Sequence, residues 1–288
     1  MIAVLLLLLS ILGGSPVHEP ARVSEYLAAP IYAVDAPAVV GANALFPLQA
    51  GQTVADSGEL TPRAYLPLVS KQIPECTPIP GVLYNTLSVN PPPTDRPAEV
   101  HADLNLALRG YEITSGYHGL VDYGGSADPK APQLYTLFAD QRVPSFPTLY
   151  QVYNWDWECN CRADLATNYP VTLAGMGTAS GEVLRLPDSG YDIGSGYEAL
   201  VLYASEERIT LKYTRDDNVV SGYTIHVENI CVEPSLLALY QAWNDAGRGQ
   251  LPALRAGQPF GRARTTEIGV AIRDAGTFMD PRSRQDWW

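Results

Sequence analysis

Short segments in which apolar and polar positions alternate recur along the chain from residue 101 onward. Between Leu104 and Leu108, leucine occupies every second position, which is the period of a half-buried β-strand. Further segments rich in Tyr, Val, Leu and Thr are separated by Gly, Pro, Asp and Asn, as in antiparallel all-β proteins. The pattern therefore predicts an all-β body with further strands at 118–123, 133–138, 148–154, 182–186, 197–204, 208–214, 222–228, 266–273 and 276–279.

One segment has the period of a helix instead. After Pro234, apolar residues fall on one face over 236–243, and Gly247 can end the helix. Proline fits the first helical turn because the amide hydrogen that it lacks has no helical partner there. We therefore predict an antiparallel β-sandwich or barrel with one helix near 234–247.

Proline is concentrated before this body. Fourteen of the 24 prolines lie between Pro16 and Pro97. Because proline fixes φ and removes a backbone donor, this stretch cannot be regular helix or central strand. We predict that residues 16–97 form an extended lead segment, partly ordered against a β-rich domain at 98–288.

Residues 2–12 form an apolar run that ends at Gly13, with no Lys or Arg before Arg22. A run of this length is too short to span a bilayer but is typical of the apolar part of a secretory signal peptide. The alternative is a buried helix or strand at the N-terminus. We predict a signal-peptide-like segment at 1–15, a secreted protein that is extracellular or at the cell surface, and no transmembrane segment in the mature chain.

Four cysteines, Cys76, Cys159, Cys161 and Cys231, in an exported chain predict two disulfide bonds. In an extended strand, Cys159 and Cys161 point the same way, so a bond between them would be strained. We therefore expect each of these two cysteines to pair with a distant one. The alternatives are a zinc site formed by Cys159, Cys161, Cys231 and His226, or free buried thiols.

The 288-residue chain carries 19 basic and 31 acidic residues, a formal net charge of −12. This excess of negative charge disfavours broad electrostatic binding to nucleic acid. A hydrophobic share of 46% excludes disorder throughout the chain. The sequence also lacks Gly-x-Ser-x-Gly, Gly-x-x-x-x-Gly-Lys and His-Glu-x-x-His, so three large classes of enzyme site have no support.

Three segments near the C-terminus carry a family resemblance: Leu254–Gly261 (LRAGQPFG), Glu267–Gly276 (EIGVAIRDAG) and Asp280-Pro281. Together they resemble the end of a lysostaphin-type (LytM-like) zinc endopeptidase domain of secreted bacterial proteins. In that family a Gly-Gln-x-x-Gly hairpin precedes a His-x-His-Phe-Glu-hydrophobic-Arg strand, followed by Gly and Asp-Pro. Upstream, Thr210–Tyr213 resembles the strand with the family's Tyr-x-His, and His101–Asn105 resembles its His-x-x-x-Asp opening. The resemblance covers about 101–110 and 182–281, and it implies a lysostaphin-like β-sandwich.

The chain departs from this family at the residues that carry its chemistry. Glu267-x-Gly269 stands where the family has His-x-His, and Asn105 stands in place of the opening aspartate. A zinc hydrolase needs three protein ligands and an open position for water, and only His101 matches the family's pattern in this alignment. We therefore predict a lysostaphin-like fold that does not catalyse zinc-dependent hydrolysis, with no catalytic residues, no metal and no cofactor.

A second set of residues offers an alternative metal site. His118 and Asp122 also read His-x-x-x-Asp, and in an extended strand residues four apart face the same side. With His226, or with Glu267, as the third ligand they would form a site of the type that suits zinc. The opposing interpretation is that His118 and Asp122 are surface residues beside a turn.

A cluster of aromatic residues follows the predicted strand at 148–154. Tyr153, Trp155 and Trp157 alternate around Asp156 and resemble a stacking platform for sugar rings. The alternative is that these side chains are core residues or cover a disulfide, because large aromatic side chains mostly bury apolar area.

These observations lead to a hypothesis of function. We expect a secreted, non-catalytic lysostaphin-like domain that binds cell-wall peptidoglycan or another surface polysaccharide. The alternatives are an active zinc endopeptidase that cleaves peptidoglycan cross-bridges, and a structural or adhesion module.

Overall fold

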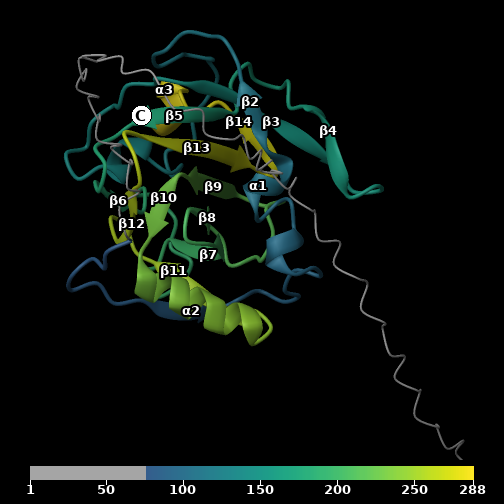
Figure 1. The fold of residues 1–288 in the computed structure, drawn as a ribbon, viewed down its shortest axis with the longest axis vertical. Helices are drawn as coiled ribbons and strands as arrows, with labels where there is room; N and C mark the ends of the chain where they lie inside the picture. The colour runs from purple at the N-terminus through teal and green to yellow at the C-terminus, as the bar shows by residue number, and fades with distance from the viewer. Residues whose placement is uncertain (1–75) are drawn as a thin grey trace, which may run out of the picture. The chain divides into compact units, whose positions relative to one another are not determined.

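Most strands of the protein belong to one twisted antiparallel sheet, which we call the main sheet (Figure 1). The computed structural model describes residues 76–288, which lie in a unit that begins at Pro67. The predicted signal-like segment at 1–15 and the lead segment up to residue 75 lie outside the described residues.

The main sheet has eleven strands in the described part of the chain. Its order is β1, β11, β7, β8, β9, β13, β5, β3, β2, with β14 paired to β13 and β4 paired to β3. The ends of this order do not meet, so the sheet is not a closed barrel. The strands are β1 (Asn85–Ser88), β2 (Tyr111–Ile113), β3 (Leu149–Asp156), β4 (Cys161–Leu165), β5 (Leu173–Gly177), β7 (Ala199–Ala204), β8 (Arg208–Lys212), β9 (Tyr223–Glu228), β11 (Gln250–Leu254), β13 (Glu267–Asp274) and β14 (Thr277–Met279).

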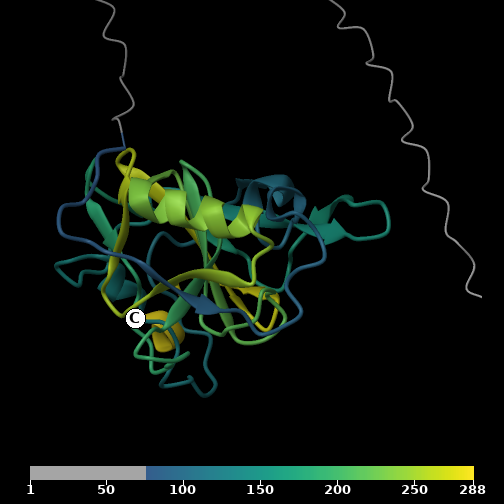
Figure 2. The same ribbon diagram turned by 90° about the horizontal axis from the view of Figure 1, so that it is seen from below.

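A second, small sheet has the order β10 (Ile230–Val232), β12 (Pro259–Ala263), β6 (Val183–Arg185). The helices are α1 (Leu106–Arg109), α2 (Pro234–Asp245) and α3 (Arg284–Trp287), with 3-10 turns at Ala98–Val100 and Leu134–Leu137. Figure 2 shows α2 lying across the end of the main sheet, where it packs on β11 and β7. Because all strand pairs of both sheets are antiparallel and the helices are few, the described chain is an all-β protein.

The two faces of the main sheet have different chemistry because side chains alternate along each strand. On β8, β9 and β13, one face carries residues such as Ile209, Ile225 and Val270, which form the main core together with Leu184 and Phe260 of the small sheet. This shared core makes the two sheets a sandwich. The opposite face, which we call the second face, carries polar residues over most of its length: Arg208, Thr210, Lys212, Thr224, His226, Glu228, Glu267 and Arg273.

The segment before and within α1 covers the middle of the second face. The hydroxyl of Thr210 donates a hydrogen bond to the carbonyl of Leu104, and Leu106 packs with Val152, Ala271 and other residues of a small apolar cluster. The carboxylate of Asp103 accepts from Arg273 at 2.8 Å and from Arg109 at 2.6 Å. These bonds hold residues 101–109 against β8 and β13.

Several predicted elements are confirmed. The structure has strands within or overlapping the predicted segments at 148–154, 182–186, 197–204, 208–214, 222–228, 266–273 and 276–279, and α2 begins at Pro234 as predicted. The helix ends at Asp245, and Gly247 follows with a φ of +91°. Pro234 stands in the first turn, where Glu233 caps the helix by accepting from the amides of Ser235 and Leu236.

Three predicted strands are wrong. Leu104 to Leu108 includes the start of α1, because the Asn105 side chain accepts from the Ala107 amide and caps a helical turn. The segment 133–138 forms a 3-10 turn, and 118–123 is a bend in which only Val121 makes a bridge, to Ser283. Alternation at 104–108 and strand-type composition at the other two segments were not enough to form a strand, because none of the three pairs with a neighbouring strand.

Part of the predicted lead segment joins the main sheet. β1 pairs with β11 at the edge of the sheet, with Asn85 opposite Ala253 and Ser88 opposite Gln250. Val89, directly after β1, lies in the main core. Residues 85–89 are thus tied to the sheet by backbone pairing and by apolar burial.

The four cysteines form two disulfide bonds, as predicted, but with a different pairing. Cys76 is bonded to Cys231, and Cys159 is bonded to Cys161. The expectation that Cys159 and Cys161 each have a distant partner is wrong because they do not lie on one extended strand. The chain turns between β3 and β4, Asn160 takes a φ of +52°, and the two Cα atoms come within 5.3 Å of each other. With all four thiols bonded, the zinc site on Cys159, Cys161, Cys231 and His226 is excluded.

We predict that the two disulfides stabilise the protein to very different extents. The sequence separation is 155 for Cys76–Cys231 and 2 for Cys159–Cys161. Each bond stabilises the folded state by removing entropy from the unfolded chain. This stabilisation is about 5 kcal/mol for the long loop and less than about 2 kcal/mol for the short one.

Guanidinium unfolding of Cys76→Ala/Cys231→Ala should therefore show a large loss in the free energy of unfolding. The matched variant Cys159→Ala/Cys161→Ala should lose little. Equal losses in the two double variants would contradict the prediction.

Candidate functional site

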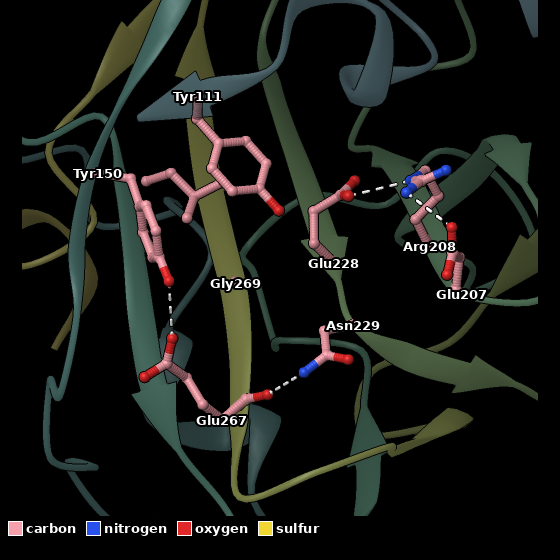
Figure 3. A pocket seen from close by; sticks show the side chains of 9 residues that line it. Tyr111, Tyr150, Glu207, Arg208, Glu228, Asn229, Glu267 and Gly269 are labelled. Carbon is pink, nitrogen blue, oxygen red and sulfur yellow. Dashed lines mark hydrogen bonds and ion pairs between the residues drawn. The ribbon is translucent and has the colours of Figure 1, made fainter. Parts of the chain in front are cut away.

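A polar pocket opens on the second face of the main sheet (Figure 3). It encloses about 320 Å³, a volume at the lower end of the range of small-ligand sites. Strands β2, β3, β5, β13, β9 and β8 contribute side chains to it, since the inward-facing position of each strand reaches the same cavity. The lining residues are Tyr111, Tyr150, Leu173, Glu207, Arg208, Glu228, Asn229, Glu267 and Gly269.

Two tyrosines form one wall of the pocket. The rings of Tyr111 and Tyr150 meet edge to face with centroids 5.1 Å apart. Both side chains are half-buried, and burial raises the pKa of Tyr111 to about 12. Both phenols are therefore neutral at physiological pH and can donate hydrogen bonds.

Glu267 lies beside this wall at the start of β13. Its carboxylate accepts a hydrogen bond from the Thr148 hydroxyl at 2.9 Å and another from the Tyr150 hydroxyl at 3.1 Å. The carboxylate rests on Gly175 of β5, where a Cβ atom would come within 2.5 Å of Glu267 Oε1. A glycine at 175 is thus required for this placement of Glu267.

Glu228 lies on the opposite side of the pocket from Glu267 (Figure 3). It is only 3% exposed, and burial raises the pKa of its carboxyl group. The Arg208 Nε atom donates to Glu228 Oε2 at 3.0 Å and offsets part of this effect. Across the strand pair, Glu228 faces Gly269, whose missing side chain leaves room between Leu173 and Glu228.

The pocket carries more negative than positive charge. Glu207, Glu228 and Glu267 contribute three carboxylates, whereas Arg208 is the single cation among the lining residues of the described chain. Arg208 binds Glu207 at 3.0 Å in addition to Glu228, and Arg264 also binds Glu207, at 2.8 Å. Ion pairs thus hold Glu207 and Glu228, on the right in Figure 3, whereas neutral hydroxyl donors hold Glu267.

This arrangement is suited to hydrogen bonding with a polyhydroxylated ligand. Carboxylates accept hydrogen bonds, Arg208 donates them, and the Asn229 amide and the tyrosine hydroxyls can do both. The two aromatic rings supply apolar faces beside these groups. No group of three or more His, Cys, Asp or Glu side chains within residues 76–288 is arranged to hold a metal ion.

The alternative metal site predicted from His118, Asp122 and His226 is wrong. His226 is completely buried on β9, where it hydrogen-bonds the Thr210 hydroxyl and lies against Phe278. His118 and Asp122 are exposed and lie in a bend, so the four-residue spacing of an extended strand does not apply to them. His118 contacts the carbonyl of Phe146, and Asp122 lies 3.7 Å from Arg284. Glu267, the other suggested ligand, belongs to the polar pocket.

The predicted stacking residues Tyr153, Trp155 and Trp157 lie on and beside the β3–β4 hairpin, which projects from the body in Figures 1 and 2. Their side chains are half-buried or exposed, with Trp157 at 39%. The guanidinium carbon of Arg96 lies 4.8 Å from the centre of the Trp157 ring, and the ring centroids of His101 and Trp157 are 5.2 Å apart. These residues do not line the polar pocket, and whether they stack on sugars stays a prediction.

Sequence reasoning missed most of the polar pocket. Glu228 could have been found from the strand at 222–228, where Thr224, His226 and Glu228 occupy alternate positions opposite the apolar ones. Tyr111 and Arg208 gave no such signal, because only the strand order brings β2 and β8 to the same cavity. Neither of these two residues lies in a motif of known chemistry.

Some of the segments that carry the family resemblance meet on the second face, whereas Leu254 and Phe260 of the Leu254–Gly261 segment lie in the main core. Glu267 and Gly269, in the positions of the family's His-x-His, both line the polar pocket, and residues 101–105 lie over the neighbouring part of the face. Comparison with protein-family models, with curated proteins and with solved structures gives no match. The lysostaphin-type resemblance therefore stays a prediction. Within residues 76–288, no helix has the length and apolar character needed to cross a membrane.

We predict a pH-dependent stability difference between the wild-type protein and Glu228→Gln. Because burial raises the pKa of Glu228, the folded state binds its proton more tightly than the unfolded state does. The contribution of this group to stability is full below its unfolded pKa and is lost as the pH rises through its folded pKa. The two proteins should thus be similarly stable near pH 4, close to the ordinary value for glutamate, and Glu228→Gln should become relatively more stable toward neutral pH.

Chemical unfolding at a series of pH values measures this difference. Glu158→Gln, which changes an exposed glutamate on the β3–β4 turn, controls for the loss of one carboxylate. Parallel pH profiles for wild type and Glu228→Gln would show that Glu228 is not desolvated.

Proposed function

We propose that the protein is a secreted, non-catalytic binding domain that recognises a neutral or amine-bearing sugar of the cell wall or of another surface polysaccharide. The observation that carries this proposal is the polar pocket, in which two tyrosine rings adjoin carboxylate, guanidinium and amide groups. Sugar rings present apolar faces and many hydroxyl groups, so they are matched by aromatic faces and by planar hydrogen-bonding side chains.

The rigidity of the pocket supports a binding role. Its walls come from six strands of one sheet, and both acidic walls are fixed by hydrogen bonds before any ligand arrives. A site held in this way loses little side-chain entropy when it binds a ligand. The excess of carboxylates favours sugars without negative charge in this pocket, since a second anion would be repelled.

The other two hypotheses receive less support. A zinc endopeptidase requires ligands that converge, and His118, Asp122 and His226 do not. A purely structural or adhesion module would not need a recessed polar pocket with a desolvated Glu228. The proposal that the protein is exported is supported by the apolar run at residues 2–12 and by the two disulfides.

We predict that Tyr111→Ala and Glu267→Gln weaken binding to isolated cell walls and to soluble neutral glycan fragments. Removing an aromatic wall or a charged acceptor costs about 1–3 kcal/mol, which corresponds to a factor of about 5 to 150 in the dissociation constant. Sedimentation with cell walls and titration calorimetry with the fragments measure the effect.

Two control variants match these changes. Tyr117→Ala alters a tyrosine that is 71% exposed and outside the pocket, and Glu158→Gln alters an exposed glutamate. Both should bind like the wild type. The proposal fails if the wild-type protein binds neither cell walls nor any of the glycan fragments, or if the controls lose as much affinity as the pocket variants.

A further inference from the structure

A second cavity, which we call the arginine cavity, lies on the same face of the main sheet, toward the Arg273 end of β13. It encloses about 280 Å³ and is lined by Arg109 of α1, Arg273 of β13, Asn154 and Trp155 of β3, Asn168 and Phe278, among others. Gly269 of the polar pocket and Arg273 are four residues apart on β13, which corresponds to about 13 Å along the strand. The two cavities are therefore separate sites.

The charges of the arginine cavity are unbalanced. Arg109 and Arg273 are each only 5% exposed, and both bind the same Oδ1 atom of Asp103, at 2.6 and 2.8 Å. Two buried guanidinium groups thus share one carboxylate. Burial lowers the pKa of Arg273 to about 10, which leaves it charged at neutral pH. Among residues 76–288, the cluster therefore keeps one positive charge that no carboxylate pairs.

Both guanidinium groups retain donors for a further acceptor. Arg109 donates to Asp103 and to the carbonyls of Ala102 and Tyr153, and Arg273 donates to Asp103 and twice to the carbonyl of Gly276. Within the described residues, these bonds use three of the five N–H groups of each side chain. The remaining N–H groups and the unbalanced charge favour an anion of planar, two-oxygen geometry, which is a carboxylate.

The other walls of the cavity fit the remainder of such a ligand. Half-buried Trp155 lines the cavity beside a register shift in the β3–β4 pairing, which allows it and its neighbour Asn154 to reach the same cavity. The exposed side chains of Asn154 and Asn168 carry amide groups that both donate and accept hydrogen bonds. An indole face and two amides suit a ring that carries hydroxyl groups. A simple inorganic anion would use only the arginine end of the cavity.

We propose that the arginine cavity binds an acidic sugar, with the sugar's carboxylate at Arg109 and Arg273 and the sugar ring against Trp155. This site goes beyond the neutral-sugar binding proposed for the polar pocket and does not depend on it, because none of its residues lines that pocket. The two pockets also differ in sign, one with an excess of carboxylates and the other with an excess of guanidinium groups.

The first experiment compares ligands on the full-length protein carrying Tyr111→Ala, so that binding of glucose in the polar pocket does not enter the comparison. Titration calorimetry or NMR line shifts with glucuronate, glucose and acetate separate the contribution of the carboxylate from that of the ring. We expect glucuronate to bind at least about tenfold more tightly than either glucose or acetate, because only glucuronate engages both ends of the cavity. Equal affinity for glucose and glucuronate, acetate binding as tight as glucuronate binding, or no glucuronate binding at all would each overturn the proposal.

Paired tryptophan variants locate the site. Trp155→Ala should weaken glucuronate binding about tenfold, whereas Trp157→Ala, which removes a ring that meets Trp155 edge to face but does not line the cavity, should weaken it much less. Equal effects of the two variants, or no effect of either, would overturn the placement. Tyr111→Ala should not affect glucuronate binding, so failure of this proposal is distinguishable from failure at the polar pocket.

A third variant tests the charge argument directly. Asp103→Asn removes the negative charge but keeps an Oδ1 acceptor for both arginines, so glucuronate should bind more tightly and should raise the melting temperature of this variant by more than that of the wild type. A merely structural role for the cluster predicts lower stability with no gain from the ligand, and that result would overturn the proposal. If Asp103→Asn does not fold, the tryptophan pair decides the question, because both of its changes lie on the projecting hairpin.

Discussion

The binding of Arg109 and Arg273 to a single carboxylate, that of Asp103, is the interaction on which both cavities depend. It fixes the 101–109 segment over the middle of the second face of the main sheet. The chain then enters β2 with Tyr111 at the wall of the polar pocket and with Arg109 at the wall of the arginine cavity. Removing one partner of a buried ion pair costs about 3–5 kcal/mol of stability. This segment is therefore firmly held on the sheet.

The alternation of side chains on β8, β9 and β13 explains why a polar face can exist inside a folded domain. One set of alternate positions supplies the apolar main core shared with the small sheet, and that core stabilises the sheet. The other set is then free to carry charged and hydrogen-bonding residues, provided that each finds a partner. Glu228 pairs with Arg208, and the Thr210 hydroxyl hydrogen-bonds His226 and the carbonyl of Leu104. Lys212 donates to the carbonyls of Ser221 and Gly222.

Local pattern was a reliable guide where a segment was long or had a capping signal. Helix α2 combines a helical period with Pro234 at its first turn, and the strands from 197 to 228 combine β-branched residues with clear breaks. It failed for Leu104–Leu108, where the capping side chain of Asn105 outweighed three alternating leucines. For the cysteines, spacing alone suggested distant partners, whereas a turn with Asn160 at positive φ brought Cys159 and Cys161 together.

The sequence by itself determined the all-β class, the position of the long helix, the presence of two disulfides and the acidic character of the chain. These properties depend on composition and on short-range periodicity, which a single chain displays directly. Only the tertiary structure decided that Glu228, Glu267, Tyr111 and Arg208 share a pocket, that His226 is buried away from His118, and that two arginines share one aspartate. The reason is that strand order in an antiparallel sheet is set by the packing of the whole core, and residues far apart in sequence become neighbours only through that order.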